Sequence, residues 1–575
     1  MTPAAHAAAA FWIMSCASLA FAMISCAPPP PVPPINPANL RFMDQGPNWT
    51  KSTRSDFYSR DQGSRIMPLR WMQALKQPNG DPFMADSLLR YGYLPNSEIP
   101  GMPIGFTAAG PSGSELIGMT CSACHTRQIT VDGVAYRIDG GPAITDFQSF
   151  LADLDTAVNT VLTNEAAFSA FAQSVLGHLP TLEEKADLHQ AVSDWFYPYH
   201  TLITRALPPK AWGPARLDAV AMIFNRLTGL DIGPLPTRVI ADNIQPADAP
   251  VRYPFLWNAP VQDKTQWPGF ADNGNDVLGL SRNLGEVYGV FAVYRPKKDP
   301  WHLLGVDFLN ENSANFRGLN ALEGLLKKIG PPKWPFAVDA ALAKQGAAIY
   351  GWPKEQGGCV ECHGIRPGVT RFFEQKTWAT PIQDVGTDTR EYDILGRTAN
   401  SGVLSGTEIP LVISPLQPQD KSMNILAVSV VGSILQEYLP LAAPQVPARR
   451  RPTFSFTPQT KDLKGAFQTT PVPHGYESRV LQGIWATAPY LHNGSVPTLA
   501  DLLKPAIERP SAFQVGPAYD RVNLGLAKDQ TTFNYTLETT DCGDRNSGNS
   551  RCGHEFGTQL TPAEKLALLE YLKVL

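Results

Sequence analysis

The pentapeptides Cys121-Ser122-Ala123-Cys124-His125 and Cys359-Val360-Glu361-Cys362-His363 share one pattern, Cys-x-x-Cys-His. This pattern is typical of c-type haem attachment, in which two thiols form thioethers to the porphyrin and the histidine binds iron. A bare Cys-x-x-Cys would also suit zinc or a thiol redox pair, but a histidine adjoins both copies. The chain is therefore expected to carry two covalently bound haem c groups. The attaching residues are Cys121, Cys124, Cys359 and Cys362, and the proximal iron ligands are His125 and His363.

Composition favours a globular protein of two to four domains, because the chain has 575 residues, of which 43% are hydrophobic and 17% charged. The formal net charge is only −4 and no basic or acidic block is present, so nucleic-acid binding is not indicated. Small molecules or redox proteins are the expected partners.

The N-terminus has the character of an export segment. Residues 7–27 contain no charge, and the first Lys or Arg is Arg41. Residues 1–27 are predicted to be an export signal or a lipoprotein leader, with Cys26 as the residue to be acylated, although about 20 apolar residues could also span a membrane. The following residues 28–40 form a Pro-rich spacer. The protein is therefore expected in the periplasm or outside the cell, with a lipid anchor at Cys26 as an alternative.

Two cysteines remain after the leader and the pentapeptides are set aside. Cys542 and Cys552 lie in a loop rich in Gly, Ser and Asn. Because export places the chain in an oxidising compartment, a disulfide between them is predicted.

The expected fold is mainly α, with two cytochrome c-like haem domains and long irregular loops rich in Pro and Gly. Residues 41–330 would form the N-terminal haem domain, with helices at 144–176, 181–203 and 215–228, while 41–118 show no clean period. Residues 246–276 concentrate aromatic side chains among Pro, Gly and Asn, and either line a pocket or pack in the core.

Residues 331–575 would form the C-terminal cytochrome c-type domain. A helix at 339–350 leads into Cys359, and Thr561-Pro562-Ala563-Glu564 is a capping box that begins a terminal helix.

An iron that has a sixth protein ligand relays electrons, whereas an iron without one can bind a small oxidant. For the second haem the candidates are Met423, His474, His492 and His554. His554 is favoured because the predicted disulfide and flanking glycines would hold its loop, and Met423 is its rival. No comparable residue stands out for the first haem, which predicts an open face, although His302 or a methionine could close it.

These motifs resemble those of bacterial di-haem cytochrome c peroxidases and their MauG relatives, and more closely the extended branch that contains the rubber oxygenases. The resemblance rests on IGMTCSACHTRQITVDG, RIDGGPAITDFQSFLADL, YPFLWNAP, LQGIWATAPYLHNGSVPTLADLL and NSRCGHEFGTQLTPAEKLALLEYLKVL. It implies that His125 is the proximal ligand of a reactive haem and that His363 and His554 form a bis-histidine pair. It also implies that Trp257 lies close to the reactive haem and tunes its chemistry.

Three functions remain open at this point. The first is a peroxidase-like oxidoreductase that reduces hydrogen peroxide at the N-terminal haem with electrons from a small redox protein. Asp263, Asp272 and Glu286 are candidates for assisting its proton transfer. The second is a haem-dependent dioxygenase that cleaves an apolar alkene such as polyisoprene. The third is a non-enzymatic electron carrier with two six-coordinate irons.

Overall fold

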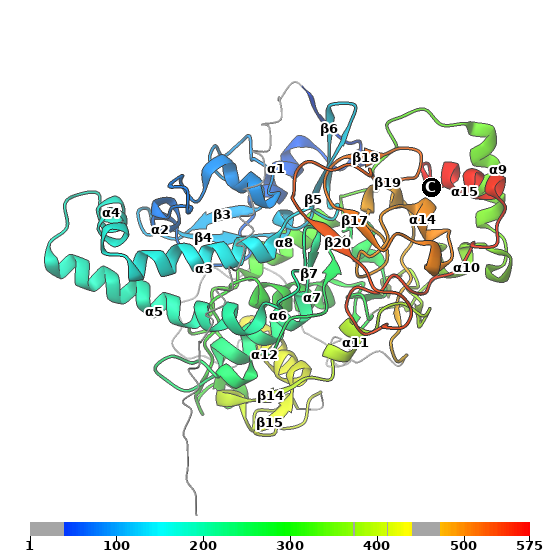
Figure 1. Ribbon diagram of the computed structural model, residues 1–575. Coiled ribbons are helices and arrows are strands. Elements are labelled where there is room, and N and C mark those ends of the chain that lie inside the picture. The colour runs from blue at the N-terminus through cyan, green and yellow to red at the C-terminus, as the bar shows by residue number, and fades with distance from the viewer. Residues whose placement is uncertain (1–38, 372–373, 411, 440–471) are drawn as a thin grey trace, which may run out of the picture.

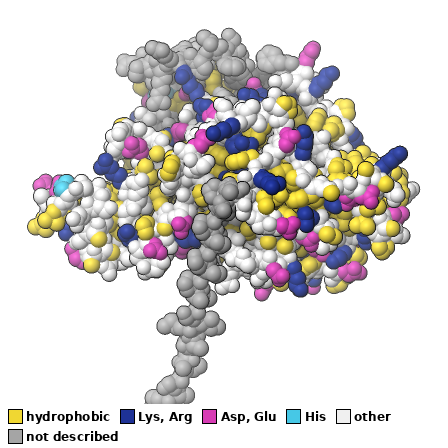
Figure 2. Space-filling model, turned by 90° about the horizontal axis from the view of Figure 1, so that it is seen from above, with side chains coloured by type: hydrophobic (Ala, Val, Ile, Leu, Met, Phe, Trp, Pro, Cys, Tyr) yellow, Lys and Arg dark blue, Asp and Glu magenta, His cyan; other side chains and the backbone are white. Residues whose placement is uncertain are grey.

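The computed structural model describes residues 39–371, 374–410, 412–439 and 472–575 (Figure 1). The predicted leader and nearly all of the Pro-rich spacer lie outside these residues. Among the residues described, no helix is both long enough and apolar enough to cross a membrane. Side chains of both charge signs are interspersed over the face seen from above (Figure 2), in keeping with the small net charge.

Helices of very different length make up much of the structure. They are α1 (Lys51–Ser59), α2 (Leu69–Ala74), α3 (Phe147–Thr163), α4 (Glu165–Leu176), α5 (Leu182–Ala206), α6 (Ala219–Arg226), α7 (Asp276–Gly289), α8 (Phe316–Leu326), α9 (Ala340–Tyr350), α10 (Val360–His363), α11 (Arg390–Ile394), α12 (Ser422–Tyr438), α14 (Leu499–Leu502) and α15 (Pro562–Leu572).

The strands are short and form small sheets. One three-stranded sheet has the order β1 (Leu40–Phe42), β6 (Val134–Asp139), β5 (Thr126–Val131), and the other has the order β2 (Met67–Pro68), β4 (Leu116–Met119), β3 (Phe106–Ala109). Two-stranded ladders pair β7 (Arg216–Leu217) with β8 (Val251–Arg252), β9 (Lys264–Thr265) with β10 (Ala271–Asp272), β11 (Lys297–Lys298) with β12 (Val306–Asp307), β13 (Ile382–Gln383) with β16 (Tyr476–Glu477), β14 (Thr398–Asn400) with β15 (Gln419–Lys421), β17 (Ala512–Gln514) with β20 (Thr536–Glu538), and β18 (Tyr519–Asp520) with β19 (Gly525–Leu526).

The prediction of a mainly α fold is therefore incomplete, because the first pentapeptide lies between strands β4 and β5. Strand β5 has the sequence TRQITV, and all but one of its residues are buried. A strand buried on both faces shows no alternation of polar and apolar residues, so its period of two is hidden in the sequence. The architecture is mixed, with helices and small sheets.

Helices α3, α4 and α5 form an arm that projects from the body of the molecule (Figure 1). The predicted helix at 144–176 is divided at Asn164, whose side chain accepts a hydrogen bond from the Ala167 N–H and so caps α4. The predicted helix at 181–203 is confirmed as α5, which begins with a capping box formed by Thr181 and Glu184. At 215–228 a short strand precedes α6.

Helices α9 and α15 pack against each other beside the second pentapeptide, at the right of Figure 1. Their close approach depends on Gly346, where an added Cβ would lie 1.9 Å from the carbonyl oxygen of Ala567. The predicted capping box is confirmed, since Thr561 accepts from the Glu564 N–H and Glu564 accepts from the Thr561 N–H. One hydrophobic cluster contains residues from both sides of position 330, including Phe255, Leu326 and Leu568.

Candidate haem sites

The imidazole of His125 in the first pentapeptide is held by a backbone carbonyl group of the aromatic loop. The Nδ1 atom of His125 lies 2.9 Å from the carbonyl oxygen of Pro254, so Nδ1–H donates there and Nε2 is left free to bind a metal. Burial lowers the pKa of His125 to about 4, which keeps the imidazole neutral as ligation requires.

The second pentapeptide repeats this arrangement. The Nδ1 atom of His363 lies 2.7 Å from the carbonyl oxygen of Arg479, which again leaves Nε2 free. Burial lowers the pKa of His363 as well. The four pentapeptide cysteines are free of disulfides, so their thiols can react with a porphyrin.

His554 faces His363 across a gap that suits one metal atom. The two ring centroids are 6.1 Å apart and the ring planes are tilted by 47°. Metal–imidazole bonds are about 2 Å long, so two imidazoles on opposite sides of one metal have centres separated by this kind of distance. Burial, followed by the nearby His363 and Arg509, lowers the pKa of His554 to about 3, so this ring is also neutral.

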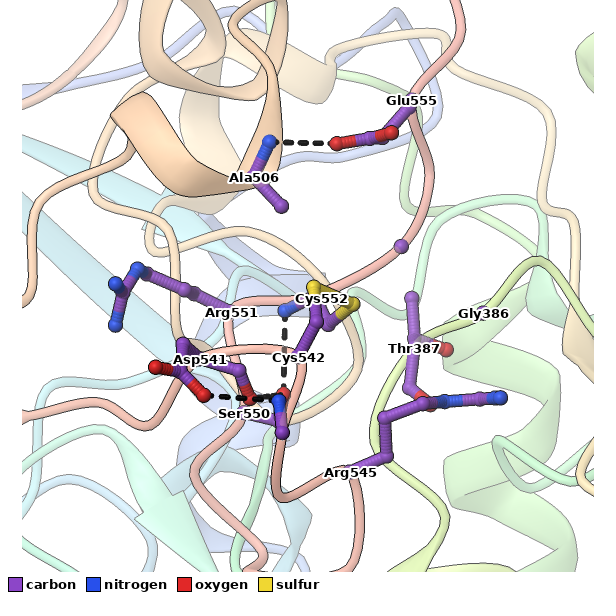
Figure 3. Close-up of a disulfide and its surroundings, with 12 residues drawn as sticks. Gly386, Thr387, Ala506, Asp541, Cys542, Arg545, Ser550, Arg551, Cys552 and Glu555 are labelled. Atoms are coloured by element: carbon purple, nitrogen blue, oxygen red, sulfur yellow. Dashed lines mark hydrogen bonds between the residues drawn. A yellow bond between two sulfur atoms is a disulfide. The ribbon is translucent and has the colours of Figure 1, made fainter.

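The loop that carries His554 is fastened at several points. The predicted disulfide between Cys542 and Cys552 is confirmed (Figure 3). The buried guanidinium of Arg509 donates to the carbonyl oxygens of Arg551 and Gly553, both at 2.7 Å, and to that of His554 at 3.1 Å. The loop also passes so close to Gly386 that a Cβ on Gly553 would lie 2.3 Å from the Gly386 carbonyl carbon.

Each pentapeptide contributes side chains to the lining of a cavity. The lining of the first cavity includes Cys121 and His125. The lining of the second cavity includes Cys359, Cys362, His363 and His554. Among the described residues that line the first cavity there is no second histidine, no methionine and no lysine.

The other candidate ligands of the second iron either lie outside the second cavity or make contacts with other side chains. Met423 is buried in the hydrophobic core and lines neither cavity. His474 is half-buried and pairs with Asp393. His492 does line the second cavity, but its ring stacks on Tyr476 with centroids 3.7 Å apart.

His302 lies outside the lining of both cavities. Its two ring nitrogens face different carboxylates, with Nδ1 2.9 Å from Asp299 and Nε2 3.6 Å from Asp307. The ring thus bridges two carboxylates.

Trp257 is fully buried and lies one side chain away from the cavities. It donates a hydrogen bond from Nε1 to the carbonyl oxygen of Gln482 and stacks on Phe255 with centroids 4.8 Å apart. Trp257 lines neither cavity, whereas Phe255 and Trp267 line both.

Five residues line both cavities, and we call them the shared wall: Arg252, Phe255, Trp267, Glu477 and Arg479. Sequence reasoning missed the three charged members. Arg252 lies in β8 at the start of the aromatic loop, whereas Glu477 lies in β16 and Arg479 follows that strand. The fold thus brings together residues from distant parts of the chain. The only available signal was the aromatic loop itself, which contains Arg252, Phe255 and Trp267.

Comparison with known proteins identifies one region of the chain. A family model described as RoxA-like, cytochrome c-like matches residues 475–514, a range that includes two charged members of the shared wall. The match shows a cytochrome c-like region, which implies a haem c protein and an extracytoplasmic location.

The chain belongs to the same family as the uncharacterized protein y4iJ of Sinorhizobium fredii, with 30% identity over 591 aligned residues that cover 92% of each chain. It is also similar to the uncharacterized protein y4iM of the same species, with 27% identity over 400 residues, 65% of this chain and 74% of that protein.

Proposed function

We propose that the protein is an exported di-haem oxidoreductase that reduces hydrogen peroxide at the haem attached to Cys121 and Cys124. Cys359 and Cys362 attach the second haem, which receives electrons from a small redox protein. The observation that carries this proposal is the unequal supply of nitrogen and sulfur ligands to the two irons. The rings of His554 and His363 are 6.1 Å apart in the second cavity, whereas the described lining of the first cavity contains no histidine besides His125 and no methionine or lysine.

Polar side chains of the first cavity support peroxide as the substrate. A haem held by His125 would supply the electrons for O–O cleavage, and the overall reaction would consume one peroxide, two protons and two electrons to give two waters. Glu286 lines this cavity and accepts a hydrogen bond from the Gln266 side chain at 2.8 Å. Burial raises the pKa of Glu286, which favours this carboxyl group as the proton donor to the departing oxygen.

The other two candidates for proton transfer, Asp263 and Asp272, form hydrogen bonds or ion pairs outside the first cavity. Asp263 accepts hydrogen bonds from the N–H groups of Val369 and Thr380, and Asp272 pairs with Lys264 and Arg371. Neither aspartate lines the first cavity.

The shared wall supports electron passage between the two cavities. Its members line both cavities, so only one layer of side chains separates them at this place. The aromatic rings of Phe255 and Trp267 are part of that layer.

Carbon monoxide binding to the reduced protein tests the open site. We expect one carbon monoxide per chain, together with one high-spin and one low-spin ferric signal in electron paramagnetic resonance. Two low-spin signals and no carbon monoxide binding would reject peroxide chemistry and favour the electron carrier.

The variant Glu286→Gln tests the proton donor. We expect it to bind carbon monoxide normally but to reduce peroxide about 10²- to 10⁴-fold more slowly, since general acid catalysis contributes about that much. Asp272→Asn is the matched control, because its carboxylate lies outside the cavity lining, and it should retain wild-type turnover. Equal losses in the two variants would remove Glu286 from the mechanism.

A second candidate function is the oxygenation of an apolar alkene such as polyisoprene. It is supported by the apolar part of the same lining, which includes Leu217, Val220, Val251, Leu256 and Leu326. Oxygen uptake on polyisoprene or small alkenes without a reductant would favour this function. Peroxide turnover that depends on a reductant, without such uptake, would favour the peroxidase.

A further inference from the structure

The shared wall contains two buried cations that have little opposing charge. The side chain of Arg252 donates to the carbonyl oxygens of Leu491 at 2.9 Å and Thr487 at 3.3 Å. Among the described residues, no carboxylate lies within ion-pair distance of this guanidinium, although Arg252 is only 5% exposed.

Arg479 is equally buried, at 5% exposure, and its strongest contacts are also neutral. Its Nε and Nη2 atoms donate to the amide oxygen of Gln262 at 3.1 Å and 2.7 Å. Glu477 is the one carboxylate in ion-pair range among the described residues, at 3.6 Å. One glutamate therefore faces two arginines in this wall.

A buried charge without a counter-ion is strongly destabilising, and proteins keep such charges where a bound group compensates them. The fixed fork of a guanidinium matches a carboxylate, and the pairing is strongest away from water. Because Arg252 and Arg479 line both cavities, an anion bound in either cavity can reach them.

We propose that Arg252 and Arg479 form a carboxylate-binding site that holds propionate groups of both haems at the shared wall. This inference rests on the proposed presence of two haems. The arginines are positioning residues: they orient the propionate edges of the two porphyrins toward each other. They also favour the reduced state of both irons, because a nearby positive charge stabilises the added electron.

The variants Arg252→Gln and Arg252→Lys test this site, with Arg216→Gln as the matched control. Arg216 is paired with Arg252 in the β7–β8 ladder, is 1% exposed, and lines neither cavity. The measurements are haem content, the midpoint potential of each haem in a spectroelectrochemical titration, and the propionate bending bands in resonance Raman spectra.

We expect Arg252→Gln to keep two covalent haems and to shift the oxidised-to-reduced ratio of both at least tenfold toward the oxidised form. That shift lowers each potential by about 59 mV. The propionate bands should change in Arg252→Gln and change less in Arg252→Lys, which keeps the charge but loses the fork. Arg216→Gln should alter neither potential.

A shift in only one potential, equal shifts in Arg252→Gln and Arg216→Gln, or unchanged propionate bands would overturn the inference. If Arg252→Gln does not fold, Arg252→Lys and Arg479→Lys decide through the Raman bands alone. The peroxidase proposal fails separately, on the carbon monoxide result of the wild-type protein.

Discussion

At the residue scale, His554 shows how a single side chain is placed by its surroundings. Its φ angle is +51°, a left-handed conformation that non-glycine residues seldom adopt. The disulfide, the three carbonyl contacts of Arg509 and the hydrogen bond from the His554 N–H to the Val385 carbonyl oxygen together hold that conformation. Such strain persists only where the surroundings enforce it, as at a ligand position.

Replacing His554 by Ala should open the second iron. We expect the low-spin ferric signal to become high-spin and the carbon monoxide bound by the reduced protein to rise from one to two per chain, because the sixth position loses its imidazole. His492→Ala is the control, since His492 lines the same cavity but stacks on Tyr476. If carbon monoxide binding stays at one in His554→Ala, the ligand assignment is wrong.

At the element scale, the contact between α9 and α15 supports the second pentapeptide from behind. The carbonyl oxygen of Tyr350, the last residue of α9, accepts the N–H of Cys359, and the Tyr350 hydroxyl donates to the carbonyl oxygen of His363 at 3.0 Å. Tyr350 of α9 thus contacts both ends of the second pentapeptide. The sequence predicted both helices, the second of them from its capping box, while their close approach depends on a glycine that the sequence did not single out.

Gly346→Ala should destabilise this helix pair. The new methyl group would meet the Ala567 carbonyl oxygen, and overpacking of this kind costs about 1–3 kcal/mol in unfolding free energy. Gly324→Ala in α8 is the control, because an added Cβ there meets nothing within 4 Å, and it should stabilise by about 0.5–1 kcal/mol. Thermal unfolding of both variants measures the difference, and a lower melting temperature in Gly324→Ala than in Gly346→Ala would contradict it.

At the scale of the whole molecule, buried carboxyl groups make stability depend on pH. Asp231 ends the π-helical turn Leu227–Asp231 after α6 and is 6% exposed. Burial raises its pKa to about 7, against the opposing effect of Arg226, Arg295 and Arg238. Between the unfolded pKa of about 3.9 and this value, the folded protein binds the proton and the unfolded chain does not. Stability therefore falls as pH rises through that window.

Asp231→Asn should flatten this dependence, because an amide does not titrate. We expect the slope of unfolding free energy against pH to differ from wild type by up to about 1.4 kcal/mol per pH unit between pH 4 and 7. Urea unfolding at pH 5 and pH 7 measures it, with Asp187→Asn on the exposed face of α5 as the control. Identical slopes in wild type and Asp231→Asn would show that the Asp231 carboxyl is ionised in the folded protein.

The sequence by itself determined the features that depend on neighbouring residues: the two pentapeptides, the disulfide loop, and the capping box of α15. Each of these involves groups within a few positions of one another, so its chemistry is written in a short pattern. The strands β4 and β5 on either side of the first pentapeptide were not predicted, because they are buried on both faces over most of their length and so lack the alternation of polar and apolar residues. The sequence favoured His554 among four candidate ligands, and the tertiary structure places it 6.1 Å from His363 between ring centroids. Only the tertiary structure decided that Trp267 rather than Trp257 lines both cavities, and that Arg252 and Arg479 belong to one wall. These contacts join segments that are far apart in the chain, and a local pattern of apolar residues does not predict which distant side chains line the same cavity.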